Sequence, residues 1–312
     1  MNMKSQAMIE KIRKHILGND SDGLVWKLAI YAFTIIVGFV FVYPLLEMVS
    51  KSFMSVKDLV NPLIIWIPSK LDISNYKKAL HVLNFWESVK TSLYVSALPS
   101  LLQMISCSLV GYGLARFRFT GKTVVIGMVV LTFLIPAQVT FIPQYLMYKD
   151  LGLLHSLKSY LLPALFGQGM KSAIFILVFF QFFAQLPKAL VEAASLDGAN
   201  NLTIFFRIAI PTAVPAFLLT FLLSMVWYWN DTYFASMYFG TEIKTLPMNL
   251  AAFEAQFSKM YPASAGTSDP NMMNEGIQMA GTMLNILPLV IIYFFTQRWF
   301  MEGIDKTGIT GE

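Results

Sequence analysis

Long apolar runs without charged residues, separated by short polar stretches, dominate this chain. A membrane helix needs roughly 20 mostly apolar residues to cross about 30 Å of hydrocarbon. Runs free of Asp, Glu, Lys and Arg, one of them interrupted by Lys171, predict six spans: Leu28–Leu46, Thr91–Ala115, Thr123–Tyr148, Gly169–Pro187, Ile208–Asn230 and Gly276–Gln297. The pattern therefore predicts an all-α integral membrane protein with six transmembrane helices.

The composition agrees with this class. Of the 312 residues, 56% are hydrophobic and only 13% are charged, whereas about a quarter are charged in a soluble domain. So little polar matter excludes a soluble enzyme and a disordered chain. The single Cys107 excludes an internal disulfide, and His15, His81 and His155 lack metal-ligand spacing, so we expect no metal site.

The distribution of basic residues predicts the topology. Basic residues precede the first span (Lys4, Lys11, Arg13, Lys14) and fill the loop between the second and third spans (Arg116, Arg118, Lys122). Because cytoplasmic loops are rich in Lys and Arg, both termini are expected in the cytoplasm. The net charge of +5 then reflects these loops, and no nucleic-acid partner is expected.

This topology divides the chain into a cytoplasmic segment 1–24, a transmembrane domain 25–300 and a cytoplasmic tail 301–312. The segment 231–275 becomes a long outer loop, in which Tyr261-Pro262 and Ser264–Pro270 predict turns. We also expect Leu157–Phe166 to form a short outer segment that packs on the bundle.

The inner connection 187–207 is unusually long. Pro187 suits the first position of a helix, and Ala189–Leu196 contains strong helix formers. Gly198 is expected to end that helix with a positive φ, and Pro211 and Pro215 to kink the entry to the fifth span. The sequence predicts a short helix between two breaks, and an ordinary interfacial helix with its turn would satisfy these local rules equally well.

The spacing within this connection is more specific. Glu192-Ala193-Ala194 is followed after three residues by Gly198, after nine more by Ile208, and then by Pro211. This series resembles the motif of bacterial ABC importer permease subunits, which is Glu-Ala-Ala, three residues, Gly, nine residues, Ile, one residue, Leu, Pro. The chain departs from it only at Ile210, which replaces the Leu.

Further segments are similar to the carbohydrate-uptake branch of that family, and to its maltose-type second permease in particular. They are Leu114–Lys122, Ile135–Val139 with Ile142-Pro143, Leu151-Gly152-Leu153, Trp229-Asn230-Asp231 and Leu246-Pro247 with Leu250–Phe253. The resemblance covers nearly all of Tyr31–Glu312 and is weakest over Ser258–Glu275. It implies a type I ABC importer permease bundle with a cytoplasmic coupling helix.

The resemblance also implies that this helix docks into a cleft of a separate ATPase subunit, which forms a dimer. The implied ATPase-coupling residues are Glu192, Ala193, Ala194, Ser195, Leu196, Asp197, Gly198, Ile208 and Pro211. The other implied partners are a second homologous permease, an extracytoplasmic solute-binding protein and membrane lipid. ATP and Mg²⁺ are expected on the ATPase, with no cofactor in this chain, and the location is the bacterial cytoplasmic membrane.

A nucleotide site in the chain itself is a poor alternative. Thr120–Thr123 resembles the end of a P-loop, but the pattern requires Gly where Arg116 stands. We interpret this segment as a basic turn between two spans.

The end of the fifth span offers a candidate substrate path. Trp227, Trp229, Asn230 and Asp231 combine aromatic rings with polar groups, as sugar sites do. An interfacial aromatic belt is the alternative, and in the maltose-type system the partner permease supplies most sugar contacts.

The predicted function is ATP-driven, binding-protein-dependent import of a sugar, with an oligosaccharide as the expected cargo. Two alternatives stay open. One is the same importer class with a non-sugar solute. The other is a membrane-embedded transferase, which would need convergent acids, histidines or a metal site that the sequence does not offer.

Overall fold

The computed structural model describes residues 24–262 and 272–306, and all regular elements in this part of the chain are helices. The described residues form two compact units, one from 24–77 with 274–283 and the other from 78–262 with 272–273 and 284–306. The sequence expectations for 1–23, 263–271 and 307–312, which include the basic residues before the first span and the turns of Ser264–Pro270, lie outside the described residues.

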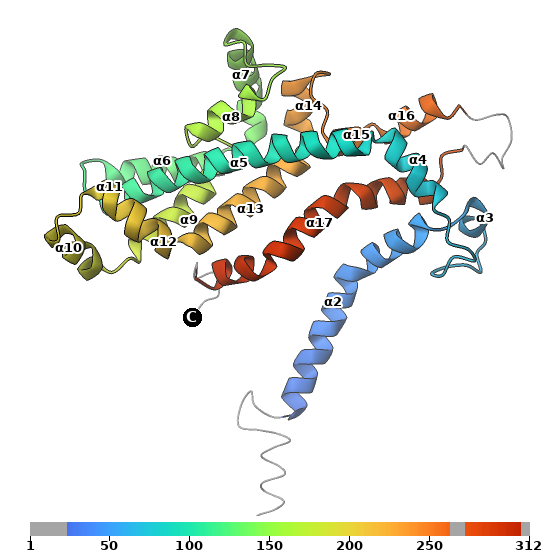
Figure 1. Cartoon of the computed structure of the whole chain (residues 1–312), viewed down its shortest axis with the longest axis horizontal. Coiled ribbons are helices and arrows are strands. Elements are labelled where there is room, and N and C mark those ends of the chain that lie inside the picture. The colour runs from blue at the N-terminus through green and yellow to red at the C-terminus, as the bar shows by residue number, and fades with distance from the viewer. Residues whose placement is uncertain (1–23, 263–271, 307–312) are drawn as a thin grey trace, which may run out of the picture. The chain divides into compact units, whose positions relative to one another are not determined.

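The first unit contains two complete helices and the first turns of two more (Figure 1). They are α2 (Leu24–Ser52), α3 (Val56–Leu59), the start of α4 (Ser74–Val82) and the start of α17 (Glu275–Lys306).

The second unit contains the remaining helices and the rest of α17. In chain order they are α5 (Phe85–Arg116), α6 (Lys122–Leu134), α7 (Ala137–Asp150), α8 (Lys158–Leu165), α9 (Ser172–Ala184), α10 (Lys188–Leu196), α11 (Asn201–Ile204), the π-helix η1 (Phe205–Ala209), α12 (Ile210–Thr212), α13 (Val214–Asn230), α14 (Tyr233–Phe239), α15 (Leu246–Ala251) and α16 (Phe253–Met260).

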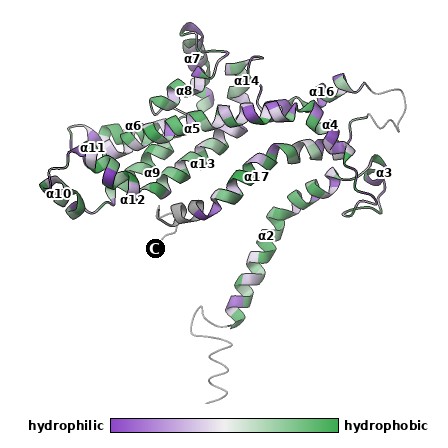
Figure 2. Ribbon diagram, in the orientation of Figure 1, coloured by the Kyte–Doolittle hydropathy of each residue, from purple (hydrophilic) through white to green (hydrophobic). Residues whose placement is uncertain are grey.

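By length and composition, the described helices supply three membrane spans, or up to six if each bent pair is counted as one span. Three helices, α2, α5 and α17, are long and apolar enough to cross a membrane alone. Three pairs pass the same test together: α6 with α7, α9 with α10, and α11–α12 with α13. Figure 2 shows hydrophobic residues along most of α2 and α13. The predicted all-α membrane fold is confirmed.

The predicted third span, Thr123–Tyr148, is broken into two helices in the structure. Helices α6 and α7 meet there at a bend of 98°. The break falls at Ile135, which is extended (φ −73°, ψ 121°) because it precedes Pro136, and proline disfavours the helical conformation in the residue before it. The absence of charged residues predicts that a segment is apolar, but it does not predict where the helix bends.

Other boundaries also differ from the expected ones. The fourth span begins at Ser172 rather than Gly169, since Lys171 takes a left-handed conformation (φ +57°). The expected outer loop 231–275 holds α14, α15 and α16 rather than loop alone. These helices are too short to stand out as periodic segments in a sequence. As expected, the segment Leu157–Phe166 packs on the bundle, as the helix α8.

Helix α5 is the centre of the second unit and packs against α8, α9 and α13. Its buried face carries small residues, which let neighbouring backbones approach closely. Gly111 shows how close: a Cβ there would lie 2.6 Å from the Phe179 Cβ and 2.9 Å from the Phe180 nitrogen of α9.

A buried amide joins three segments of this bundle. Gln103 of α5 donates to the Met170 carbonyl (2.6 Å) and accepts from the Ser224 hydroxyl of α13 (3.1 Å). The Tyr228 hydroxyl accepts from the Met170 N–H at 3.1 Å. Only glycine fits at position 169 beside this cluster, because a Cβ there would lie 2.5 Å from the Tyr228 hydroxyl.

In the first unit, the end of α2 is held by polar contacts. Lys51 forms ion pairs with Glu47 (2.8 Å) and with Glu275 at the start of α17 (2.6 Å). The Asn75 amide donates to the carbonyls of Ser52 (3.0 Å) and Met54 (2.9 Å), which close the end of the helix.

Candidate coupling segment and substrate path

Helix α10 is the most exposed short helix of the predicted coupling segment 187–207. Pro187 precedes it in an extended conformation, and none of its residues is buried. Leu196 is 89% exposed and Leu190 is 44% exposed, although both are apolar. A bend of 72° separates α10 from α9, so α10 does not continue the direction of that helix. An exposed, partly apolar helix of this kind is suited to contact a partner.

The end of α10 is a Schellman motif with Gly198 at its centre. The Gly198 N–H donates to the Ser195 carbonyl (3.1 Å), and the Ala199 N–H to the Ala194 carbonyl (2.9 Å). Gly198 has φ +82°, which glycine adopts without the steric penalty of a Cβ. The predicted break at Gly198 is therefore confirmed, and the two bonds fix the direction in which the chain leaves the helix.

A second cap follows immediately. The Asn200 side chain accepts from the Thr203 N–H (2.8 Å) and the Thr203 hydroxyl (2.9 Å), and so begins α11. Two helix termini with satisfied backbone groups thus lie within three residues of Gly198. The turn between α10 and α11 is short and well hydrogen-bonded.

The base of the segment is anchored in the core. Phe205 is 3% exposed. Its ring centroid lies 4.8 Å from that of Tyr112 in α5 and 6.1 Å from that of Phe183 in α9. Phe205 opens η1, in which the Ile210 N–H donates to the Phe205 carbonyl. At the other end of the segment, Arg116 of α5 donates to the Leu186 carbonyl (3.5 Å).

The structure separates the predicted coupling residues into two groups. Those on and just after α10 are exposed or half-buried: Glu192, Ala193, Ala194, Ser195, Leu196, Asp197 and Gly198. Ile208 is half-buried within η1, and Pro211 is exposed in α12, just before the predicted kink, which falls between Pro211 and Pro215. The bend between α11–α12 and α13 is 75°. The motif thus combines an exposed helix, a glycine turn and an anchored base.

The four predicted substrate-path residues do not share one surface. Trp227 is half-buried against Phe175 (5.2 Å between rings), and Asn230 is exposed, with its amide donating to the Val226 carbonyl (2.9 Å). Trp229 is 1% exposed, and its indole N–H has no hydrogen-bond partner among the described residues. A direct contact of these residues with substrate stays a prediction.

Asp231 lies inside the protein, only 9% exposed. Its carboxylate accepts a hydrogen bond from the Tyr160 hydroxyl of α8 and another from the Phe234 N–H of α14 (3.1 Å). Burial raises the pKa of this carboxyl, while the hydrogen bond from Tyr160 acts in the opposite direction. Burial also raises the pKa of Tyr160, with a further contribution from the Asp231 charge.

Tyr160 and Gln103 were not singled out from the sequence. Gln103 carried a signal, since a glutamine within an uncharged span needs a polar partner. Tyr160 carried none, because its partner Asp231 lies 71 residues away.

A nucleotide site at Thr120–Thr123 finds no support in the geometry. Thr120–Thr123 joins the end of α5 to the start of α6, and Gly121 precedes α6, so the strand that a P-loop requires is missing there. Within residues 24–262 and 272–306, no group of three His, Cys, Asp or Glu side chains could hold a metal ion.

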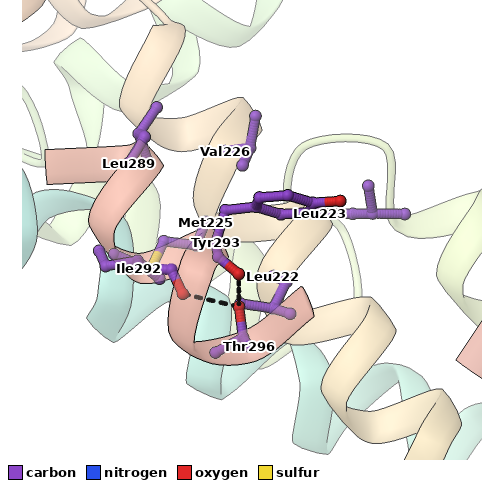
Figure 3. A pocket seen from close by; sticks show the side chains of 8 residues that line it. All are labelled: Leu222, Leu223, Met225, Val226, Leu289, Ile292, Tyr293 and Thr296. Atoms are coloured by element: carbon purple, nitrogen blue, oxygen red, sulfur yellow. Dashed lines mark hydrogen bonds between the residues drawn. The ribbon is translucent and has the colours of Figure 1, made fainter. Parts of the chain in front are cut away.

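A pocket of about 130 Å³ lies between α13 and α17 (Figure 3). Its lining is Leu222, Leu223, Met225, Val226, Leu289, Ile292, Tyr293 and Thr296. The Thr296 hydroxyl donates to the carbonyls of Ile292 (2.8 Å) and Tyr293 (3.4 Å) of its own helix. So apolar a lining is poorly suited to hold sugar hydroxyls.

Comparison with known proteins gives several relatives that match nearly the whole chain. The polygalacturonan/rhamnogalacturonan transport system permease protein YtcP of Bacillus subtilis (strain 168) is 28% identical over 92% of this chain and 99% of its own length. The arabinooligosaccharides permease protein AraQ of Halalkalibacterium halodurans is 27% identical (92% and 97%). The diacetylchitobiose uptake permease protein DasC of Streptomyces coelicolor is 26% identical (93% and 98%).

The fold is also that of a solved transporter chain. A chain of a bacterial ABC transporter that imports the acidic polysaccharide alginate superposes with a TM-score of 0.70, at 23% identity, over 88% of this chain and 96% of that one. The family model of binding-protein-dependent transport system inner membrane components matches residues 108–306, more than half of the chain. The protein therefore belongs to this family of membrane permease components, which act with a separate ATPase and a solute-binding protein.

Proposed function

We propose that this chain is one of two permease subunits of an ATP-driven importer in the bacterial cytoplasmic membrane, with an oligosaccharide as its cargo. The observation that carries the coupling role is the exposed helix α10, fixed by the Gly198 turn and anchored by Phe205. The cargo proposal is supported by the relatives named above, whose names specify oligosaccharide or polysaccharide transport.

In this account α10 docks on the ATPase on the cytoplasmic side. The exposed Leu196 supplies apolar contact area, and the small side chains of Ala193 and Ala194 allow a partner backbone to approach. Glu192 and Asp197 supply charge that orients the contact. Because α10 is held at both ends, closure of the ATPase dimer would move it as a lever.

The second permease completes the translocation path, and the two permeases rock between inward-open and outward-open states. ATP and Mg²⁺ bind to the ATPase subunits, and this chain has the mechanical role. We also propose that both termini lie in the cytoplasm, as the distribution of basic residues indicates. Trp227, Trp229, Asn230 and Asp231 remain candidates for the substrate path.

A reconstituted complex tests this function. Sugar uptake and ATP hydrolysis are measured in proteoliposomes that contain the ATPase, both permeases and the binding protein. Leu196→Asp is expected to abolish binding-protein-stimulated hydrolysis and uptake. Leu151→Asp, which places the same charge at a leucine 62% exposed after α7, is the control and should retain both activities. Equal activity in the two variants would contradict the docking role of α10.

The cargo is tested separately by a ligand screen on the cognate binding protein. Binding of an oligosaccharide supports the proposal, whereas selective binding of an amino acid, phosphate or peptide favours the same importer class with another solute.

We further propose that the outer loop 231–275 is long enough to reach into the docked binding protein. Deletion of Ser258–Asn271, part of which lies outside the described residues, is then expected to weaken stimulation by the binding protein without blocking membrane insertion. Unchanged stimulation would contradict a docking role for this segment.

A further inference from the structure

The loop after α3 exposes an unusual number of large apolar side chains. Val60 is 76% exposed, Leu63 89%, Ile65 67% and Ile67 83%. A loop in water normally carries polar residues, and a contiguous exposed apolar patch indicates contact with a partner or a membrane. We call residues 60–67 the apolar loop.

Contacts within the first unit place the apolar loop beside α2. The Trp66 indole meets the Tyr43 ring edge-on, with 5.0 Å between ring centroids and 83° between planes. The Ser50 hydroxyl donates to the Trp66 carbonyl. The backbone of Trp66 thus lies beside Ser50 of α2. Its side chain extends toward Tyr43, which precedes Ser50 by seven residues, about 10 Å along the helix axis.

The charged residues at the end of α2 indicate the depth of the Trp66–Tyr43 contact in the membrane. Glu47, Lys51 and Glu275 form one ion-pair cluster, which belongs at the polar boundary of the span. Tyr43 precedes Glu47 by four residues, about 6 Å to the apolar side. The Trp66 ring therefore lies within the outermost turns of a membrane-spanning helix, the depth at which Trp and Tyr are enriched.

The surroundings of α2 favour lipid as the occupant. Within the first unit, no residue in the apolar window of α2 is buried, and Figure 2 shows hydrophobic residues along most of the length of this helix. A segment that lies against a helix surrounded by hydrocarbon faces the same medium. The neighbouring Lys57 and Lys70 are exposed and can remain at the level of the lipid headgroups.

We propose that the apolar loop is a second membrane anchor, in which Leu63, Ile65 and Ile67 insert into the phospholipid interface at the Ser52 end of α2. The Trp66–Tyr43 contact sets its depth. The loop would fix the vertical position of α2 and hence of the polar cluster at its end. This inference depends only on α2 being a membrane span, so it is independent of the cargo and of the ATPase contact.

Spin-label accessibility tests the proposal in the assembled transporter in phospholipid nanodiscs. Single cysteines at Leu63, Ile65 and Ile67 are labelled in a Cys107→Ser background, with Lys57→Cys and Lys77→Cys as exposed controls of the same unit. Three separate positions ensure that one poorly assembling variant does not decide the result, and each labelled complex is first checked for assembly. The collision rates of each spin label with molecular oxygen, which partitions into the membrane, and with a water-soluble nickel chelate are then measured.

The proposal predicts that oxygen accessibility exceeds nickel accessibility at 63, 65 and 67, and that the order is reversed at 57 and 77. Nickel accessibility at the loop equal to that of the controls would place the loop in water and overturn the proposal. Shielding of the loop labels from both reagents would show a covering protein, such as the second permease or the binding protein, and would also overturn it.

Discussion

The Tyr160 hydroxyl donates a hydrogen bond to the Asp231 carboxylate, which joins α8 to the junction of α13 and α14. The same carboxylate accepts from the Phe234 N–H in the first turn of α14. Nearby, the His155 N–H donates to the Tyr238 carbonyl (2.7 Å). In the described conformation, Asp231 thus holds the start of the segment 231–275 to the bundle.

This relationship predicts the effect of Tyr160→Phe. Loss of the donor leaves a buried carboxylate with one partner fewer, which should destabilise the protein by about 1–3 kcal/mol. The melting temperature of the purified complex, followed by thermal shift, should fall. Tyr233→Phe, at a tyrosine 53% exposed in the same aromatic cluster, is the control and should melt like the wild type.

A double-mutant cycle isolates the pair. With Asp231→Asn, which retains an oxygen for the Phe234 N–H, the effects of the two substitutions should be less than additive. Full additivity, or a Tyr160→Phe variant that melts like Tyr233→Phe, would show that the hydrogen bond does not join these elements.

The contact of α5 with α9 predicts opposite outcomes for two nearby glycines. Gly111→Ala should destabilise by about 1–3 kcal/mol, because its Cβ would clash with the Phe179 Cβ at 2.6 Å. Gly113 of the same helix has nothing within 4 Å of an added Cβ, so Gly113→Ala should be neutral or stabilise slightly. Equal melting temperatures in the two variants would refute the close packing at Gly111.

The buried amide of α5 predicts a similar contrast. Gln103→Leu leaves the Met170 carbonyl and the Ser224 hydroxyl without this partner, and should destabilise by about 1–3 kcal/mol. Gln138→Leu, at an exposed glutamine of α7, is the control. A thermal-shift measurement that ranks Gln138→Leu as the more harmful change would contradict the role of Gln103 as a joint between segments.

The turn at Gly198 predicts a functional effect that arises from the backbone alone. A Cβ at Gly198 meets nothing within 4 Å, but φ is +82°, and a β-branched residue there is strained by about 1–2 kcal/mol. Gly198→Val, and also Gly198→Asp through charge placed at the interface, should separate ATP hydrolysis from sugar uptake. Gly127→Val, in helix α6 with equal free space, is the control. Wild-type uptake by both Gly198 variants would remove the assignment of this turn to coupling.

Local rules account for what the sequence predicted. Residues a few positions apart determine the α10 helix, its end at Gly198 and the kink between Pro211 and Pro215. The spans follow from uncharged runs. The break at Ile135 also has a local cause, namely Pro136, but the length of an uncharged run does not take this proline into account. Bends at proline are tolerated in membrane helices, so hydropathy alone cannot place them.

The remaining features depend on tertiary contacts. Asp231 has a side chain of the type that binds sugar hydroxyls. Only the fold shows that its carboxylate accepts a hydrogen bond from Tyr160, which lies 71 residues earlier. Likewise, Gln103 meets Met170 and Ser224 across 67 and 121 residues. Pairings at such separations cannot be found from one sequence by spacing rules.

The central claim is that this chain works as a permease coupled through α10 to a separate ATPase. The most direct measurement is a pull-down of the tagged chain from native membranes in mild detergent, with mass spectrometry of the bound proteins. We expect the wild type to recover a second six-helix permease and a P-loop ATPase, and Leu196→Asp to lose the ATPase while it retains the second permease. Recovery of the chain without partners, under conditions that preserve other membrane complexes, would contradict this claim and favour the membrane-embedded transferase.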